Sequence, residues 1–158
     1  MNEEKKEEVD FLKHLLEKPT KKKSRKVTEK DMEKVVADSH IMFNLCFTQI
    51  GLYPGGLAVH HSQIDGKNPL DFFVTAEKEI IINPVIINHT KVLVDRQEAC
   101  LSFRFDPPKT VERYNKVTVK YEKINTEGKT DTVEENMSGR RAQMFQHEID
   151  HKKAKYIY

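Results

Sequence analysis

The chain has 158 residues, of which 37% are hydrophobic and 33% are charged. This length and composition predict one globular domain with a real core and some polar tail. The formal net charge of +2 is too small to indicate a nucleic-acid-binding protein by itself. No apolar run approaches the length of a membrane span, and residues 1–8 lack the apolar segment of a secretory signal. We therefore expect a cytoplasmic protein that does not cross a membrane.

Residues 1–27 are expected to form a charged, flexible appendage to a domain that covers residues 28–158. Val9, Leu12 and Leu16 give the appendage only a short apolar edge. Residues 18–26 are a basic run with almost nothing to bury. Such a run is typical of a solvated linker, and the alternative is a contact with RNA phosphates, for example on a ribosome.

A long amphipathic helix is predicted after Thr28, which can serve as an N-cap with Asp31 three residues later. The apolar side chains then follow at spacings of three and four residues as far as Ile50, and Gly51 ends the pattern. Cys46 lies on the apolar stripe of this helix, so we expect it to be a small buried core residue.

Strand patterns follow the helix. They cover residues 70–74, 80–87 (interrupted by Asn83-Pro84), 92–94, 101–105, 117–124 and 130–134. The turn Asn125-Thr126-Glu127-Gly128 predicts a hairpin between the last two. A final helix is predicted from Gly139 to about Lys153. This order predicts an α+β fold, in which mixed or antiparallel sheets pack around the C-terminal helix and the amphipathic helix precedes them.

The C-terminal helix carries the pattern H-E-x-x-H, at His147, Glu148 and His151. Histidines four residues apart on a helix project from one face and can bind one metal ion, with the intervening Glu placed to move a proton. No His, Cys, Asp or Glu follows His151, so we expect a third protein ligand from upstream. Cys100, expected on a short strand, is a competent ligand that leaves a fourth position for water. The alternatives are a buried strand cysteine and a chance motif on a solvated helix.

These segments resemble the peptide deformylase family, whose motifs are G-x-G-φ-A-A-x-Q, E-G-C-φ-S and Q-H-E-x-D-H. The third motif matches without a break at Gln146 to His151, and the second differs at one position in Glu98-Ala99-Cys100-Leu101-Ser102. Ile82-Asn83-Pro84 and Val111-Glu112-Arg113 also resemble family segments. The likeness covers residues 28 to 158 and leaves out the first 27.

The first motif departs from the family. Gly56-Leu57-Ala58-Val59 matches, but the Gln position counted from Gly56 holds His61, and Gln63 comes two residues late. We prefer Gln63 in this role because Gln63-Ile64 continues as the family does, with His61 as the alternative. His60 and His61 are otherwise surface residues or, less readily, additional metal ligands. Ala99 stands where the family has Gly.

The resemblance implies a peptide deformylase that removes the N-formyl group from the N-terminal methionine of nascent polypeptides. One divalent ion, Fe²⁺ or Zn²⁺, would be held by Cys100, His147 and His151, and a metal-bound hydroxide would attack the formyl group. Glu148 would transfer the proton, while the Leu101 N–H and the Gln63 amide would stabilise the oxyanion.

Other residues have roles that the resemblance suggests but spacing alone does not show. Glu98 would pair with Arg113. Asp150 would orient a ligand or face solvent, and Met144 would line the methionine pocket or pack in the helix core. Two other functions remain open: another metallo-amidase or peptidase, and a non-catalytic deformylase-like protein that binds a peptide or the ribosome.

Overall fold

A computed structural model of the chain describes residues 2–3, 19–49, 57–100 and 106–158. A five-stranded antiparallel sheet has the order β1-β2-β3-β6-β7, and a separate two-stranded ribbon pairs β4 with β5. The strands are β1 (Ala58–His60), β2 (Phe72–Thr75), β3 (Ile80–His89), β4 (Leu93–Glu98), β5 (Lys109–Tyr114), β6 (Lys116–Ile124) and β7 (Thr130–Ser138). The helices are the 3-10 helices η1 (Glu29–Asp31) and η2 (His61–Gln63), and the α-helices α2 (Met32–Gln49) and α3 (Gly139–Lys152).

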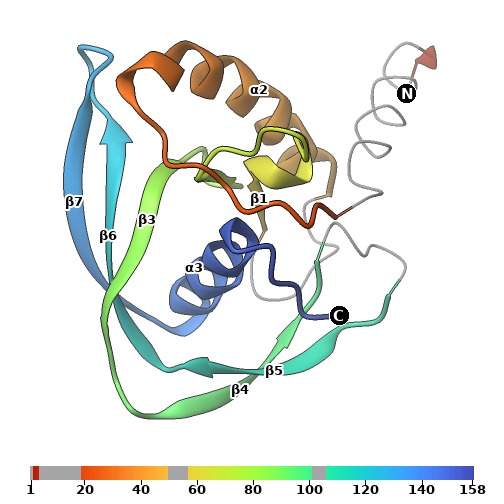
Figure 1. Cartoon of the computed structure of the whole chain (residues 1–158). Helices are drawn as coiled ribbons and strands as arrows, with labels where there is room; N and C mark the ends of the chain where they lie inside the picture. The colour runs from red at the N-terminus through yellow and green to blue at the C-terminus, as the bar shows by residue number, and fades with distance from the viewer. Residues whose placement is uncertain (1, 4–18, 50–56, 101–105) are drawn as a thin grey trace.

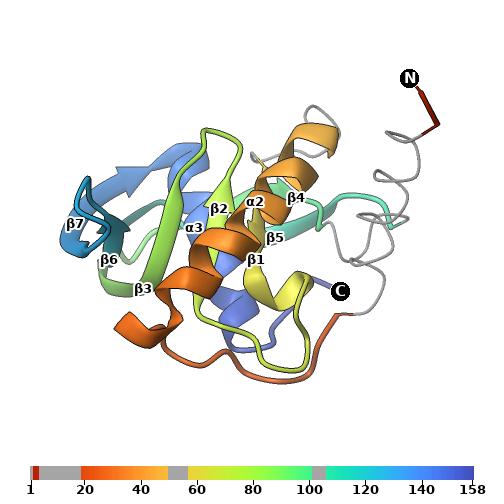
Figure 2. The same ribbon diagram turned by 90° about the horizontal axis from the view of Figure 1, so that it is seen from above.

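The helix α3 lies between the large sheet and the β4–β5 ribbon, while α2 lies across β1, β2 and β3 (Figures 1 and 2). The predicted α+β class, with sheets packed around the C-terminal helix, is therefore confirmed. No helix within the described ranges is long and apolar enough to cross a membrane.

Most of the predicted elements are present, with some differences. The hairpin forms around Gly128, whose φ of 75° suits glycine, and its second strand continues to Ser138. At Asn83-Pro84 the strand β3 bulges but is not broken: Asn83 has a φ of 51° and the register with β6 shifts there. Asn tolerates this left-handed conformation better than most residues. The strand β5 was not predicted, and the predicted strand 101–105 lies outside the described residues.

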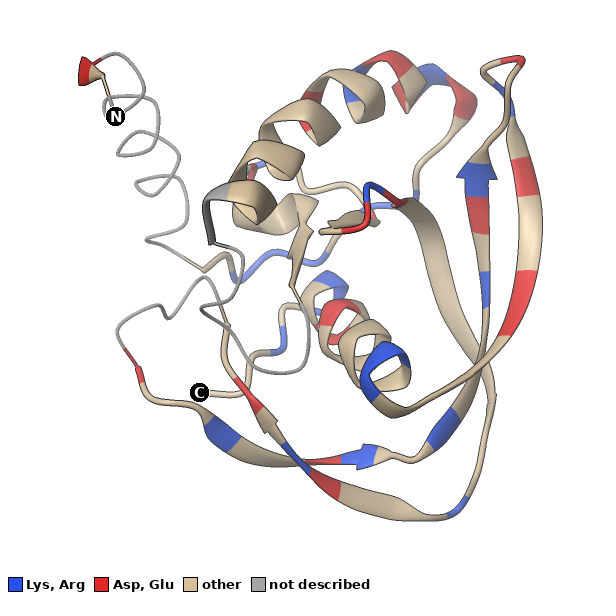
Figure 3. Cartoon of the chain, turned by 180° about the vertical axis from the view of Figure 1, so that it is seen from behind, with Lys and Arg blue, Asp and Glu red and all other residues tan. Residues whose placement is uncertain are grey.

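Residues 19–27 lie against the domain, which corrects the expectation of a flexible, solvated linker for this part of the segment. Arg25 forms a parallel bridge with Leu70, and the Ser24 N–H donates to the Lys152 carbonyl at 2.8 Å. Figure 3 shows this lysine-rich stretch passing the C-terminal end of α3. Val27 is buried, and the Asn83 side chain bonds both its N–H and its carbonyl. The prediction for residues 4–18 falls outside the described residues.

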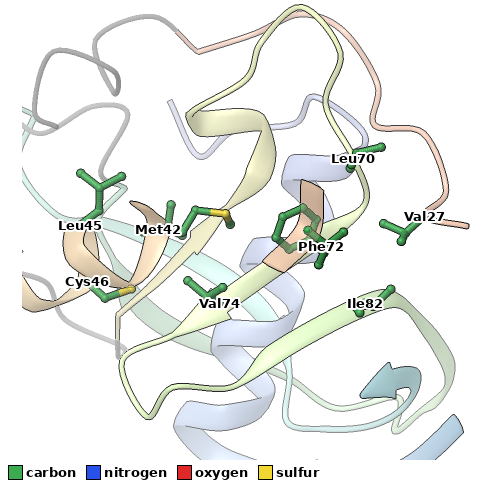
Figure 4. Packing of buried hydrophobic residues seen from close by; sticks show 10 residues of the cluster. Val27, Met42, Leu45, Cys46, Leu70, Phe72, Val74 and Ile82 are labelled. Atoms are coloured by element: carbon green, nitrogen blue, oxygen red, sulfur yellow. The ribbon is translucent and has the colours of Figure 1, made fainter. Parts of the chain in front are cut away.

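The hydrophobic core has two parts because side chains of a strand alternate between the two faces of the sheet. Phe72 and Val74 of β2 face α2, together with the buried α2 residues Met42, Leu45 and Cys46 (Figure 4). Cys46 is thus a core residue, as expected. Phe73, between them, packs on the opposite side against Phe145 of α3, with ring centroids 5.1 Å apart. The core therefore fixes α3 from its apolar side and leaves its other side for polar residues.

Candidate metal centre

The helix α3 begins abruptly after β7 and presents two different faces. Gly139 has a φ of 60°, a conformation that favours glycine and turns the chain from strand into helix. Ala142, Phe145 and Ile149 bury the apolar face. On the polar face, Gln143 donates to the Gln97 carbonyl of β4 at 2.8 Å, and Gln146 bonds both the N–H and the carbonyl of Tyr114. These amides hold α3 against the β4–β5 ribbon.

Cys100, His147 and His151 form a cluster in which one donor atom from each lies within 4.8 Å of the others. The Sγ of Cys100 is 3.5 Å from Nε2 of His151. Cys100 is buried, but it lies two residues after the end of β4 and not on a strand as expected. One thiolate and two imidazoles suit Zn²⁺ or Fe²⁺ and leave a coordination position for water.

Glu98 anchors one side of this cluster. Its carboxylate accepts hydrogen bonds from the Arg113 guanidinium at 2.6 and 2.8 Å, and it lies 2.7 Å from Nδ1 of His147. Burial opposes the carboxylate charge, yet these partners lower the pKa of Glu98 to about 2. A carboxylate on the outer nitrogen fixes the orientation of a metal-ligating histidine. The other nitrogen of His147 then remains for the side of the cluster that holds Cys100, with which this ring also interacts.

Arg113 also links the network to Asp150, whose Oδ2 accepts a 2.7 Å hydrogen bond from Nη1. The Glu98–Arg113 pair suggested by the resemblance is therefore present. Asp150 keeps a side-chain exposure of 35% but is tied to this pair, so it is not simply a solvent-facing residue.

The two histidines differ in their electrostatic surroundings. Burial opposes a charge on His147, but hydrogen bonds with Cys100 and Glu98 raise its pKa to about 10. Burial lowers the pKa of His151 well below its ordinary value. A neutral imidazole, as at His151, is the form of histidine that binds a metal ion.

Glu148 is buried, and its Oε2 has no hydrogen-bond partner among the described residues. Burial raises the pKa of this carboxyl to about 7. A buried carboxylate oxygen without a hydrogen-bond partner destabilises the fold. Its presence therefore calls for an explanation, and a catalytic function is one. A pKa near neutrality suits a group that takes up and releases a proton.

The structure brings Gln63, and not His61, to the cluster. Nε2 of Gln63 lies 3.9 Å from the Cys100 sulfur, and its Oε1 accepts from the His60 N–H at 2.8 Å. His61 is held elsewhere: its Nε2 is 2.7 Å from Asp38, and its Nδ1 accepts from the Leu70 N–H at 2.8 Å.

His60 and His61 are both fully buried, so the surface interpretation of them is wrong. Neither belongs to the three-residue cluster. Leu101, the other expected oxyanion donor, lies outside the described residues.

Met144 is half-buried, and it lines a cavity of about 380 Å³ together with Leu57, Ala76 and Arg140. Asp71, which no sequence pattern indicated, is buried near His60, with its Oδ1 3.8 Å from Nε2 of that ring. No sequence signal joins these two residues, because only the pairing of β1 with β2 brings their segments together.

The chain is similar to known proteins over nearly its whole length. A family model described as polypeptide deformylase matches residues 9–158, so the match starts earlier than the predicted residue 28. Peptide deformylase 2 of Bacillus anthracis is 36% identical over 109 residues, which are 68% of this chain and 53% of that protein. The chain thus spans about half the length of this relative and of the Bacillus cereus protein of the same name.

Two further similarities cover more of both chains. Peptide deformylase of Buchnera aphidicola subsp. Cinara cedri is 30% identical over 144 residues, 90% of this chain and 86% of that protein. The crystal structure of peptide deformylase from Thermotoga maritima superimposes with a TM-score of 0.70 at 28% identity, and the match covers 90% of this chain and 88% of that chain.

Proposed function

The chain belongs to the polypeptide deformylase family, and we propose that it is a metal-dependent hydrolase that removes the N-formyl group from the N-terminal methionine of nascent polypeptides. The observation that carries this proposal is the convergence of Cys100, His147 and His151 beside the buried carboxylate of Glu148. One divalent ion, Fe²⁺ or Zn²⁺, is the proposed cofactor.

The proposed mechanism assigns a task to each residue. Cys100, His147 and His151 would hold the ion, which when bound supplies Lewis-acid activation of water. Glu148 would take the proton of the attacking water and deliver it to the leaving amine. The side-chain amide of Gln63 would donate a hydrogen bond to the oxygen of the formyl group as negative charge develops on it, and we assign a second such bond to the N–H of Leu101.

A metal analysis combined with a substrate assay tests this function. Protein purified without oxygen should contain one divalent ion per chain and should deformylate a formyl-methionyl peptide. Cys100→Ala should abolish the binding of stoichiometric metal. Cys46→Ala, which changes a buried core cysteine of α2, should leave metal binding intact. Equal metal loss in both variants would contradict the ligand assignment.

The same assay separates the alternatives. Cleavage of an internal peptide bond, with the formyl group untouched, would favour a metallopeptidase. Binding of the peptide without turnover would favour a non-catalytic relative. A cytoplasmic location stays a prediction from the sequence.

We also propose that the basic segment 18–26 contributes to a contact with ribosomal RNA. Support comes from a cavity of about 640 Å³ that has five lysines in its lining: Lys23, Lys26, Lys120, Lys152 and Lys153. Phosphate contacts release counterions, so binding to ribosomes should weaken steeply between 50 and 200 mM salt. Replacing Lys23, Lys26 and Lys120 by Glu should abolish binding, while the same charge change at Lys109, Lys116 and Lys129 should not.

A further inference from the structure

Behind the candidate metal centre, three buried polar atoms lack hydrogen-bond partners among the residues that the structure describes. They are Nε2 of His60, Oδ1 of Asp71 and Nδ1 of His151. The two histidines have no exposed surface and Asp71 has 6%. His60 connects the three, because its Nε2 lies 3.8 Å from Asp71 Oδ1 and its ring centroid lies 6.2 Å from that of His151. A buried polar group without a hydrogen-bond partner is unfavourable, and one water molecule can be the partner of several such groups at once.

The neighbouring contacts fix the positions of the ring protons. Nδ1 of His60 accepts a hydrogen bond from the Ser62 N–H at 3.1 Å, so the proton of this ring is on Nε2. His151 turns its Nε2 towards the Cys100 sulfur, so as a metal ligand it carries its proton on Nδ1. Two N–H donors and one carboxylate oxygen therefore remain. The 3.8 Å between His60 and Asp71 is too long for a direct hydrogen bond.

Asp71 is held in place and is not free to close this gap. Its Oδ2 accepts from Nζ of Lys152 at 3.2 Å, and Lys152 also donates to the Pro84 carbonyl. The backbone N–H of Asp71 donates to the Arg25 carbonyl at 2.8 Å. The unpaired Oδ1 is thus a fixed acceptor 3.8 Å from the Nε2 donor of His60.

We propose that His60 and Asp71 bind one buried water molecule that accepts a hydrogen bond from His151 Nδ1–H and so positions His151 as a metal ligand. The water would accept from both imidazoles and donate to Asp71 Oδ1, and three hydrogen bonds are the usual number for a buried water. An acceptor on the outer nitrogen fixes the tautomer and orientation of a ligating histidine and raises its basicity. Glu98 has the matching place beside His147. His60 and Asp71 are positioning residues, because they act only through His151.

A crystal structure of the zinc-loaded protein tests the geometry directly. It should show one water within about 3.2 Å of the three atoms. A His151 Nδ1–H that donates to a backbone carbonyl instead would overturn the inference.

Measurements of metal affinity test whether the proposed water helps His151 to bind the metal. In His60→Phe the ring is kept and the N–H is lost, so Co²⁺ binding, measured by chelator competition, should weaken by about 10–100-fold. The visible absorption of the bound Co²⁺ should also change, because His151 is no longer held in place. His60→Gln restores an N–H donor and should recover most of the affinity. The matched control is His61→Phe, which removes an equally buried imidazole that bonds Asp38 and Leu70, and it should leave Co²⁺ affinity near that of the wild type.

Each result of the Co²⁺ affinity measurements either supports or overturns the inference. Unchanged Co²⁺ affinity in His60→Phe, or equal losses in His60→Phe and His61→Phe, would overturn the inference. If circular dichroism shows that His60→Phe does not fold, Asp71→Ala takes its place: it removes the carboxylate acceptor of the water, and unchanged Co²⁺ affinity would again overturn the inference. The inference rests on the proposed metal-dependent function. A wild-type protein without stoichiometric metal would refute that function, whereas tight metal binding that ignores His60 and Asp71 would refute only the role of these residues.

Discussion

At the scale of single residues, Glu148 gives the sharpest prediction. Its carboxylate is buried with one oxygen unpaired, and an amide of the same shape still forms hydrogen bonds but cannot carry a proton. Glu148→Gln should therefore keep its metal and lose about 10²–10⁴-fold in deformylation rate. Metal content and kcat, measured on the same preparation, check this. A variant that retains metal and nearly wild-type kcat would rule out Glu148 as the proton carrier.

A second pair of substitutions decides whether Gln63 or His61 is the oxyanion donor. Removing one oxyanion donor costs about 10²–10³ in kcat, and we expect this loss in Gln63→Ala with the metal retained. His61→Ala should lose far less activity, because both of its ring nitrogens are committed to Asp38 and Leu70. The reverse order of the two kcat values would return the donor role to His61.

At the scale of elements, the same His61 contacts tie η2 to α2 and make the stability of the protein depend on pH. Burial keeps the pKa of His61 below its ordinary value of 6.5, against the opposing effect of Asp38. The unfolded chain therefore binds a proton near pH 6.5 while the folded chain does not. The stabilisation is complete above pH 6.5 and is lost as the pH falls below it, by at most about 1.4 kcal/mol per pH unit.

Urea unfolding at pH 7.5 and 5.5 measures this dependence. His61→Gln should be less stable than the wild type at pH 7.5, and the difference between the two proteins should shrink at pH 5.5. An equal difference at both pH values would show that another group is responsible.

The elements also show what the sequence predicts and what it leaves hidden. Periodicity predicts α2, α3 and the β6–β7 hairpin, because each buries one face along a continuous stretch. The β4–β5 ribbon is harder to predict: β5 follows Pro107-Pro108, and only one of its six residues is buried, so no apolar alternation marks it. Its position depends on pairing with β4 and on contacts with α3.

The candidate site also has a part that the sequence predicts and a part that it does not. The spacing within one helix predicts that His147 and His151 can share a ligand, since i and i+4 lie on one face. The approach of Cys100 and Gln63 depends on long-range folding, and only the family motif pointed to them. The sequence suggests His60 only as a surface residue or an additional metal ligand, and nothing marks Asp71, because polar residues next to apolar strands are usually exposed.

At the scale of the whole molecule, the contacts of residues 19–27 define where the domain can be cut. A chain that starts at Thr28 should be less stable than a chain that starts at Pro19. The shorter chain loses the buried Val27, worth about 1.5–3 kcal/mol, and leaves the Asn83 amide without its backbone partners. Thermal unfolding of the two truncated chains, compared with the full chain, checks this. Equal midpoints for all three would restore a domain boundary at Thr28.

The central position of α3 has a consequence for the time course of folding. This helix is the last element along the chain, yet its side chains bond residues far back in the sequence, with Arg141 reaching 62 residues to Glu79 and Lys152 reaching 81 residues to Asp71. Such distant contacts must close large loops before they stabilise anything, so we expect refolding in milliseconds to seconds and not microseconds. We therefore expect the cluster of Cys100, His147 and His151 to assemble only after these distant contacts have formed. In a stopped-flow experiment, the absorption of bound Co²⁺ should rise after, or together with, the recovery of the circular dichroism signal. An earlier rise would mean that the helix binds the ion before the sheets enclose it.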